Sequence, residues 1–430
     1  MTGAESIDQP TLRCRECGRA APTTGPQYCE WCFGPVEVVL APPRLDPPDL
    51  RNVIGSGPES LARYAPLLPS GLALSSDGAG WTPLRRAPAL GAAIGLDDLW
   101  IKDETANPTG SFKDRVVEVA VARALAAGMR VLACSSTGNL ARAVAGAAAR
   151  RHLSAVVLVP DDLDPAEVRD LAARGAVVVA VRGGYDAASR LGADAASDLD
   201  RWAWVNVTLR PWYEIGARTA GWEIVEQLGW RLPDRVVAPM ASGSLVRALH
   251  ESMAHLVDVE LTSGNAPKVT AVQPAGCAPV AAAFAAGAER VRPLRGPHTI
   301  AESLEMGDPP DGQAVLDLAR ATGGAVAAVA EEVIMGGVEL LLQTEGIRVE
   351  PSGGVVVAGL ADLVTSGVVD RSETVVAVLT GSPPRLWSSD PAGWRSTGDG
   401  PGVVPARGVA GTIEPSVSAL TGLLPSELLR

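Results

Sequence analysis

Positive charge and histidine are scarce in this chain of 430 residues. Asp and Glu number 49 against 37 Lys and Arg, and the net charge of -12 argues against a surface that binds nucleic acid or anionic lipid. An anionic ligand would therefore need local groups to attract it. The four histidines are scattered, so they indicate neither a histidine metal site nor a histidine base: His152, His250, His255 and His298.

Long apolar runs are also missing. No stretch approaches the roughly 18 apolar residues of a membrane span, and residues 1–10 lack the basic start and apolar core of a signal peptide. Hydrophobic residues make up 47% of the chain and charged residues 20%, a balance typical of an enzyme with a large core. We therefore expect a cytoplasmic protein without a membrane or nucleic-acid partner, long enough for two or three domains.

Six cysteines are present, and four of them form two C-x-x-C pairs, Cys14 with Cys17 and Cys29 with Cys32. A glycine follows each pair closely, which favours two tight turns, and four thiolates on two turns suit the tetrahedral geometry of structural zinc. Two redox dithiols or two disulfides are the alternatives. A closed zinc site would fold a segment too short for a core of its own. The two remaining cysteines stand alone and are interpreted as small buried residues: Cys134 and Cys277.

The stretch from Lys102 to Arg115, KDETANPTGSFKDR, places one lysine in an unusual setting. The run just before it, Leu99 to Ile101, predicts a short strand, Asn107 to Gly110 predicts a turn, and the alanine-rich run from Val116 to Leu125 predicts a helix. Lys113 then lies near a helix N-terminus, where unpaired N–H groups and the helix dipole favour the neutral amine that forms a Schiff base with a cofactor aldehyde. A solvated lysine in the first turn of a helix is the alternative interpretation.

Three loops of small polar residues follow predicted strands, at residues 134–139, 239–244 and 380–382. Between about residues 50 and 385, short β-branched runs alternate with alanine-rich helical stretches, which predicts a mostly parallel sheet covered by helices. Ligands of such sheets bind at the carboxyl ends of the strands. Taken singly, the first loop fits a helix N-cap equally well, the second lacks the lysine of a nucleotide-triphosphate loop, and the third fits a plain turn.

Together, these segments resemble the pyridoxal-phosphate enzymes of the tryptophan-synthase-β fold and, within them, the threonine synthases. The NPTGSFKDR stretch is specific to this group, and the later segments favour the zinc-ribbon branch. The likeness runs over nearly the whole chain, through residues 32–38, 80–84, 107–115, 136–139, 239–244, 273–279, 299–301, 344–347 and 379–381.

The resemblance implies an α/β fold of pyridoxal-phosphate fold type II, with two open parallel-sheet domains, the cofactor in the cleft between them, and an N-terminal zinc ribbon. A homodimer is the usual form of this fold. The small domain is expected to be mobile and to close over the site. The implied division is a zinc ribbon at 1–40, a large domain at 41–130 and 210–385, a small domain at 131–209, and a C-terminal tail with a docking helix at 386–430.

Carried over position by position, the resemblance implies that Lys113 forms the Schiff base with pyridoxal 5'-phosphate and that Phe112 lies beside the cofactor ring. Asn139 would bond the phenolic oxygen, and Thr380 would face the pyridine nitrogen. A neutral hydroxyl there favours elimination or replacement over transamination, because it does not hold that nitrogen protonated. The cofactor phosphate would be cradled by Ser242, Gly243 and Ser244.

The family's reaction converts O-phospho-L-homoserine and water into L-threonine and phosphate. Lys113, displaced by this small anionic amino acid, would move the protons at Cα and Cβ. The substrate carboxylate is expected to be bound by Ser135, Ser136 and Thr137, and the leaving phosphate by Arg210 and Arg218, with Asn206 a weaker candidate.

Two segments depart from the family pattern. Residues 210–219, RPWYEIGART, stand where threonine synthases usually read R-P-Y-Y-x-E-G-S-K-T, so Ile215, Ala217 and Arg218 replace a glutamate, a serine and a lysine. Glu214 offers a carboxylate one position earlier. Residues 382–385, Ser-Pro-Pro-Arg, replace Asn-Gly-Leu-Lys.

Three hypotheses follow from these departures. The first is a threonine synthase, the second an enzyme of β- or γ-replacement or elimination on another amino acid, and the third a catalytically silent binding protein that keeps the fold. Lys113, Asn139 and Thr380 are present together, which favours an enzyme.

Overall fold

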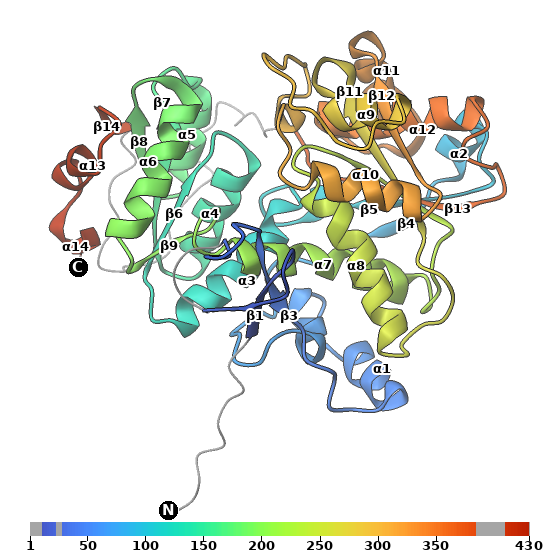
Figure 1. Cartoon of the computed structure of the whole chain (residues 1–430), viewed down its shortest axis with the longest axis horizontal. Helices are drawn as coiled ribbons and strands as arrows, with labels where there is room; N and C mark the ends of the chain where they lie inside the picture. The colour runs from blue at the N-terminus through green and yellow to red at the C-terminus, as the bar shows by residue number, and fades with distance from the viewer. Residues whose placement is uncertain (1–10, 23–27, 384–408, 430) are drawn as a thin grey trace, which may run out of the picture.

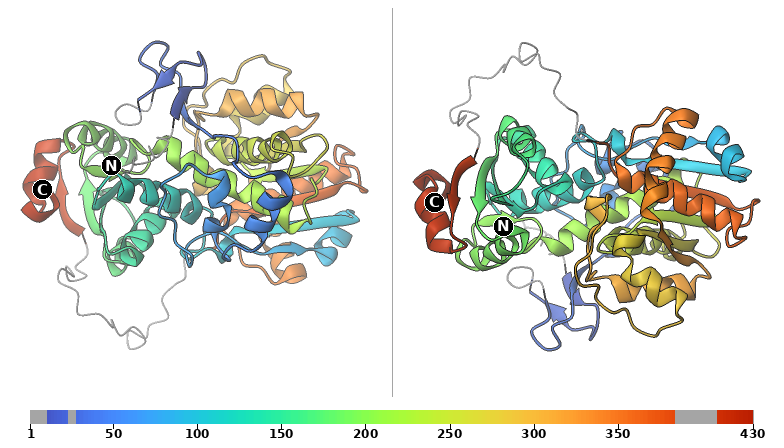
Figure 2. Two further views of the ribbon diagram at one scale, coloured as in Figure 1. Left: turned by 90° about the horizontal axis from the view of Figure 1, so that it is seen from below. Right: turned by 90° about the horizontal axis from the view of Figure 1, so that it is seen from above.

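The computed structural model describes residues 11–22, 28–383 and 409–429. Two lobes, each built on an open and mostly parallel sheet, stand side by side, and a small antiparallel sheet of N-terminal residues packs against helix α7 (Arg210–Gln227) near their junction (Figures 1 and 2). The first ten residues and residues 384–408, including Pro384 and Arg385 of the second departure, lie outside the described part.

The larger lobe contains a six-stranded sheet with the order β12-β11-β10-β13-β5-β4, in which only the β4–β5 pair is antiparallel. Both faces are covered by helices, so the strands read as continuous apolar runs. Val236 and Val376 belong to the core shared with α3 (Lys113–Ala126), α7 and α8 (Ser244–Asp258). Val237 and Val375 belong to the core shared with α2 (Pro88–Ile94), α11 (Glu331–Glu345) and α12 (Pro351–Thr365). The strands are β4 (Leu84–Arg86), β5 (Asp98–Asp103), β10 (Arg235–Pro239), β11 (Lys268–Pro274), β12 (Ala325–Val329) and β13 (Thr374–Leu379).

The smaller lobe contains a five-stranded, all-parallel sheet with the order β14-β8-β7-β6-β9. Helices α4 (Asn139–Arg150) and α6 (Gly184–Asp198) contact this sheet, and α13 (Val417–Leu423) packs on α6. The strands are β6 (Val131–Ser135), β7 (Ser154–Pro160), β8 (Val177–Val181), β9 (Trp202–Trp204) and β14 (Val409–Ile413).

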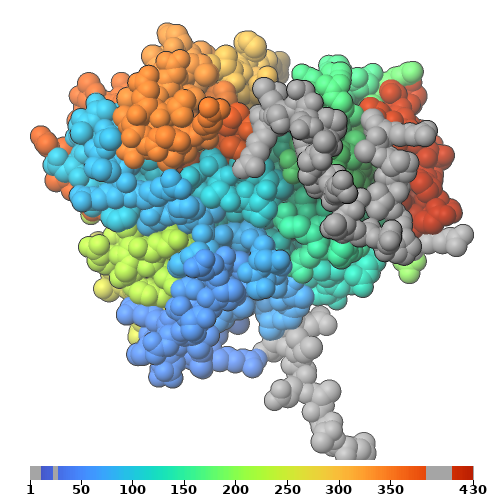
Figure 3. Space-filling model, turned by 180° about the vertical axis from the view of Figure 1, so that it is seen from behind, coloured from blue at the N-terminus to red at the C-terminus, as the bar shows by residue number. Residues whose placement is uncertain are grey.

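The C-terminal residues take a form that the sequence did not suggest. A single docking helix is expected there, but β14 first joins the edge of the smaller sheet beside β8, and α13 (Val417–Leu423) and α14 (Ser426–Leu429) follow. Seen from behind, this segment forms the outer margin of the smaller lobe (Figure 3). The strand was missed because its sequence, Val-Ala-Gly-Thr-Ile, has a glycine at its centre and little alternation of polar and apolar residues.

The N-terminal sheet has the order β2-β1-β3. Its strands are β1 (Thr11–Cys14), β2 (Ala20–Ala21) and β3 (Val36–Val39). The division of the chain into domains at residues 40, 130, 209 and 385 stays a prediction.

Short 3-10 helices and longer α-helices link the strands. None of the helices in the described ranges has both the length and the apolar character needed to cross a bilayer. The remaining α-helices are α1 (Pro47–Gly55), α2 (Pro88–Ile94), α3 (Lys113–Ala126), α4 (Asn139–Arg150), α5 (Pro165–Ala173), α6 (Gly184–Asp198), α8 (Ser244–Asp258), α9 (Pro279–Ala285), α10 (Gly312–Ala321), α11 (Glu331–Glu345) and α12 (Pro351–Thr365). The 3-10 helices are η1 (Leu61–Leu67), η2 (Glu104–Ala106), η3 (Ala275–Cys277) and η4 (Glu302–Leu304).

Candidate active site

Lys113 is the first residue of α3, and the half-buried side chain of this lysine lines a cleft. The preceding residue, Phe112, donates its backbone N–H to the carbonyl oxygen of Thr380 at 2.9 Å, just beyond the carboxyl end of β13. The helix start that carries the lysine is therefore fixed to the end of a central strand. This is the place where parallel sheets bind their ligands.

A buried ion network holds the turn that leads to Lys113. Arg115 donates to Glu104 and to Glu223 at 2.6 Å each, and Lys102 donates to Glu223 at 2.5 Å, with all four side chains fully buried. Burial raises the pKa of Glu223, but the charges of Arg115 and Lys102 prevail and lower the pKa to about 2. Losing one member would leave an uncompensated charge in the core.

The other charged side chains of residues 102–115 are engaged in ion pairs or hydrogen bonds, and Lys113 is the one left for chemistry. Asp103 accepts from Thr105, and Asp114 accepts from the backbone and hydroxyl of Thr109 at 2.8 and 2.7 Å. The ε-amine of Lys113 instead meets a phenol, at 2.5 Å from the Tyr213 oxygen, and forms no ion pair with a carboxylate within the described ranges. The amine is thus placed to serve as a nucleophile.

A cleft with an empty volume of about 510 Å³, open solvent included, surrounds Lys113. It brings together all the residues expected to bind the cofactor, from segments more than 250 positions apart in the sequence. These are Phe112, Lys113, Asn139, Ser242, Gly243, Ser244 and Thr380.

Four helices begin at this cleft. Lys113, Asn139 and Ser244 are the first residues of α3, α4 and α8, and Glu350 is the N-cap of α12. Unpaired N–H groups and the positive end of the helix dipole favour anions at such termini. This arrangement supplies the local attraction for an anion that the acidic chain as a whole does not provide.

The loop after β10 has the geometry of a phosphate cradle. Gly243 adopts φ +91°, a conformation that favours glycine, and caps α8. The Ser242 and Ser244 hydroxyl oxygens lie 3.0 Å apart on either side of it. Hydroxyl groups and free helix N–H groups thus face the cleft together.

Glu350 is a cleft residue that the sequence reasoning missed. Its carboxylate accepts hydrogen bonds from Asn139 at 3.0 Å, Ser352 at 2.8 Å and Ser303 at 3.0 Å. The Ser352 oxygen lies 3.3 Å from that of Thr380, so one carboxylate connects the two side chains expected at opposite edges of the cofactor ring. The only sequence signal was an acidic residue before Pro351 at a helix start, which also fits a helix cap.

The expected carboxylate-binding loop is not among the residues that line the cleft. Ser135 is buried at the end of β6, and its hydroxyl donates to the Ala188 carbonyl at 3.0 Å. Ser136 accepts from the Gly138 N–H at 3.4 Å, and Thr137 is half-buried. Asn206 donates to the Ser135 carbonyl at 3.2 Å.

The structure separates the two arginines expected to bind the leaving phosphate. Arg210 begins α7, packs over the Tyr213 ring at 5.2 Å and donates to Glu214 at 3.3 Å. Arg218 points elsewhere, into ion pairs with Glu251 at 2.7 Å and Glu37 at 3.8 Å.

The other departures in this helix also face away from the cleft. Ile215 and Ala217 are buried and belong to the hydrophobic core. Glu214 pairs with Arg247 as well as Arg210. These three side chains are not among those lining the cleft.

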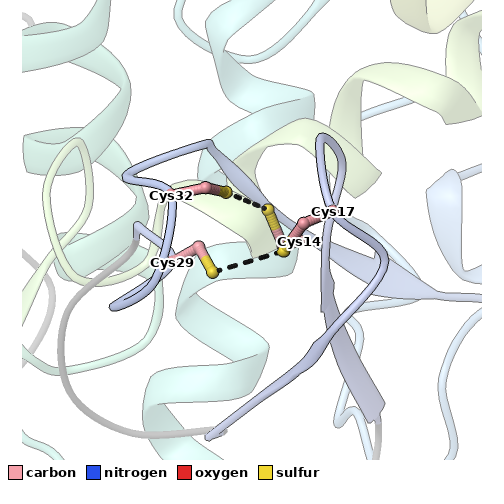
Figure 4. A group of neighbouring side chains, drawn as sticks. All are labelled: Cys14, Cys17, Cys29 and Cys32. Atoms are coloured by element: carbon pink, nitrogen blue, oxygen red, sulfur yellow. Dashed lines mark hydrogen bonds between the residues drawn. The ribbon is translucent and has the colours of Figure 1, made fainter.

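The four clustered cysteines come from two turns and point toward one another (Figure 4). Their sulfur atoms all lie within 4.8 Å of one another, and this is the cluster of potential metal ligands found among the described residues. Both turns are present: Gly18 has φ +71° in the first, whereas in the second the left-handed residue is Phe33, with φ +58°, rather than Gly34. The two lone cysteines are buried as expected, and burial raises the pKa of Cys134 to about 12.

The thiols of this cluster cannot all ionise without a cation. The Cys32 and Trp31 N–H groups lower the pKa of Cys29 to about 7, and the Cys17 N–H lowers that of Cys14. The Gly34 N–H acts in the same direction on Cys32, but the hydrogen bonds with the neighbouring thiols of Cys14, Cys17 and Cys29, together with burial, outweigh it and raise the pKa of Cys32 to about 12. A divalent cation would remove this mutual repulsion.

Comparison with known proteins identifies the class to which this cleft belongs. Residues 75–381, which include every residue lining it, match the family described as pyridoxal-phosphate dependent enzyme. The chain belongs to this family.

Its curated relatives define the branch. The chain is 34% identical to the threonine synthase of Methanosarcina acetivorans, over 86% of this chain and 91% of that protein. It is 31% identical to that of Methanocaldococcus jannaschii over the same shares, and 30% identical to that of Mycobacterium tuberculosis over 70% of this chain and 81% of the relative. Within the family the chain groups with the threonine synthases, as its sequence segments predict.

Solved structures share the fold. The processed form of threonine deaminase isoform 2 from Solanum lycopersicum superimposes with a TM-score of 0.60 at 20% identity, over 84% of this chain and 90% of that one. Maize serine racemase gives a TM-score of 0.59 at 20% identity, over 79% of this chain and 94% of that one. The prediction of fold type II is confirmed.

Proposed function

We propose that this protein converts O-phospho-L-homoserine and water into L-threonine and phosphate, using pyridoxal 5'-phosphate held in the cleft around Lys113. The observation that carries the proposal is the convergence, in one cleft, of an amine free of counter-ions with four helix N-termini. The threonine synthase relatives, which match most of the chain, direct the choice of reaction.

The residues present fit the cofactor. Lys113 offers the amine for its aldehyde, the 242–244 loop offers hydroxyl and N–H donors for its phosphate, and Asn139 and Thr380 flank the space for its ring. When bound, pyridoxal phosphate supplies an electron sink that makes protons next to the amino group of the substrate removable.

The chain's own residues would then place charges and protons. Lys113, once displaced by the substrate, is positioned to take the protons from Cα and then from Cβ, so that phosphate can leave from Cγ. Protons then return to Cγ and Cα, and water adds at Cβ to give threonine. The Tyr213 phenol holds that amine by its hydrogen bond. Thr380 presents a neutral hydroxyl, and the helix termini attract both phosphate groups.

Closure of the smaller lobe is part of the proposal. The residues expected to bind the substrate carboxylate lie on that lobe and do not line the cleft in this conformation. A movement of the lobe would bring the Ser136 and Thr137 hydroxyls to the substrate and exclude water. Ser135 would keep its bond to Ala188 and act through its backbone.

The four cysteines are proposed to hold a structural zinc. Four sulfur ligands within 4.8 Å of one another match the closed tetrahedral site of this metal. The site lies on the N-terminal sheet and has no open position for a substrate. The expected homodimer is likewise a proposal, which light scattering would test.

The replacement or elimination alternative lacks an observation of its own. It was motivated by Ile215, Ala217 and Arg218, and none of these side chains lines the cleft. The departures alter the core and a surface ion network rather than the residues around Lys113.

Two measurements test the proposal. Purified protein supplied with pyridoxal phosphate should develop the visible absorption of a protonated imine, lost in Lys113→Ala and after borohydride; a colourless protein would refute the cofactor site. Phosphate release should then be compared for O-phosphohomoserine, O-phosphoserine and O-phosphothreonine, with the amino-acid product identified. Threonine from the first substrate supports the proposal, whereas turnover of another substrate alone supports the replacement or elimination hypothesis.

A further inference from the structure

A chain of contacts leads from the cysteine cluster to the phosphate loop. Arg15, which follows Cys14 directly, donates from Nη1 to Oδ1 of Asp311 at 2.8 Å. The Asp311 backbone N–H donates in turn to the carbonyl oxygen of Ser242 at 3.0 Å. Only one residue therefore separates the arginine of the N-terminal sheet from the loop that faces the cleft.

Asp311 also supports that loop by direct packing. A Cβ atom added at Gly243 would lie 3.0 Å from the Asp311 Cβ and 3.1 Å from its carbonyl oxygen. The Asp311 side chain is 2% exposed. The loop thus rests on this residue on the side away from the cleft, and a shift of Asp311 would move Ser242 and Gly243 with it.

The charge of Asp311 makes its partners important. A buried carboxylate behind a phosphate site repels the bound dianion unless cations neutralise it. Arg247 contributes at 3.2 Å, but this arginine is also shared with Glu214 and Glu251. Arg15 has Asp311 as its ion-pair partner among the described residues, so it supplies the dedicated counter-charge.

The position of Arg15 depends on the cysteine turn that contains it. Its backbone N–H donates to the Pro35 carbonyl at 2.9 Å, beside the second turn, and the Gly18 N–H closes the first turn on the Cys14 carbonyl at 3.0 Å. The four thiols of the two turns approach one another within 4.8 Å. A bound metal would fix both turns, and with them the root of the Arg15 side chain.

We propose that Arg15 is a positioning residue for the cofactor phosphate, acting through Asp311, so that metal in the cysteine cluster sets how tightly the phosphate is held. This inference rests on the proposed cofactor site. It assigns the N-terminal sheet a role in the affinity of the cleft, beyond its own folding.

The test compares two aldehydes that differ only in the phosphate. Apoprotein is titrated with pyridoxal 5'-phosphate and with pyridoxal, and binding is followed by visible absorption. Arg15→Ala should weaken the binding of pyridoxal 5'-phosphate by about tenfold and change the affinity for pyridoxal by less than about twofold. Arg15→Lys should recover part of the loss, because it keeps the charge without the planar fork.

Arg13→Ala is the matched control. Arg13 lies two residues earlier, on strand β1, and its exposed side chain pairs with Glu37 at 3.0 Å. This variant should bind both aldehydes as the wild type does. If Arg15→Ala lost affinity equally for both aldehydes, the residue would have a merely structural role and the proposal would be overturned. No loss of affinity at all would overturn it as well.

Two further arms keep the result interpretable. In an Asp311→Asn background, Arg15→Ala should add less than about a twofold loss, because the carboxylate that needs a counter-charge is gone. Zinc-stripped wild type should show the same loss of about tenfold in its affinity for the phosphorylated aldehyde, and added zinc should restore that affinity. Removing zinc from Arg15→Ala should cause no further loss of affinity. Additive losses in either arm would contradict the coupling.

Failure of the proposed function gives a different result. If neither aldehyde binds wild-type protein, the cofactor site itself is refuted. If both aldehydes bind, but the preference for the phosphorylated one depends neither on Arg15 nor on zinc, only this inference is refuted.

Discussion

The ε-amine of Lys113 lies 2.5 Å from the phenolic oxygen of Tyr213, because two helices approach each other closely at this point. Gly216, three residues after the tyrosine, touches the backbone of α3. A Cβ atom there would lie 2.5 Å from the Arg115 carbonyl oxygen and 2.6 Å from the Val116 Cα. The missing side chain lets α7 carry its tyrosine up to the lysine.

Tyr213→Phe should therefore slow turnover while the cofactor still binds. The variant keeps the ring, which packs near the amine, but loses the hydroxyl that orients it. We expect kcat to fall about 10- to 100-fold with KM nearly unchanged. Steady-state phosphate release checks this, with exposed Tyr185→Phe as control. Unchanged kcat would show that the hydrogen bond has no part in turnover.

Glu350→Gln should loosen the cofactor ring. The substitution keeps the shape but replaces one acceptor oxygen by an N–H₂ group, so that one of the donors Asn139, Ser352 and Ser303 meets another donor. We expect about tenfold weaker cofactor binding and a shifted visible absorption maximum. Titration of apoprotein measures both. A wild-type spectrum and affinity would argue against any role of this carboxylate.

Arg210→Ala and Arg218→Ala should behave differently, although the sequence predicts that both arginines bind the leaving phosphate. Arg210 packs beside the tyrosine that contacts Lys113, so its removal should raise KM for a phosphorylated substrate about tenfold, with cofactor affinity nearly constant. Arg218 pairs with Glu251, and its removal should lower the free energy of unfolding by about 1–2 kcal/mol and leave KM unchanged. Kinetics and urea unfolding of both variants distinguish the roles; a raised KM in Arg218→Ala would contradict them.

Mild acid should destabilise the protein through His255. Burial, aided by the charge of Arg218, lowers the pKa of His255 to about 4. The unfolded chain takes up this proton below about pH 6.5 and the folded protein does not, so stability falls between about pH 6.5 and 4.

At pH 5.5 this amounts to about 1.4 kcal/mol relative to pH 7.5. Comparing urea unfolding at the two pH values, His255→Gln should lose that much less stability than wild type. Exposed His298→Gln should match the wild type. An identical pH dependence of His255→Gln and wild type would contradict the prediction.

The sequence predicted the parts of the molecule that local chemistry determines. The strand before Lys113, the helix after it, and the small-residue loops at strand ends are all present, because turn residues and β-branched runs act over a few positions. The resemblance supplied the identity of the residues that meet in the cleft, and the structure brings those expected at the cofactor together. Their roles stay predictions until the cofactor is titrated.

What the sequence did not predict depends on long-range packing. Tyr213 reaches Lys113 only because Gly216 lets two helices touch, and Glu350 reaches Asn139 from a distance of 211 residues along the chain. The different ion-pair partners of Arg210 and Arg218 follow from where Glu214, Glu37 and Glu251 lie. No pattern within a short window contains this information.

Strand β14 gives the smaller sheet an unusual order of assembly. The strand beside it, β8, is made more than 200 residues earlier, so its edge stays open until β14 has been synthesised. An open edge is a template for pairing with other chains. The lobe that carries Asn139 is thus completed only after β14 has been synthesised, and a nascent or truncated chain without β14 would present half of the cleft beside an unprotected strand.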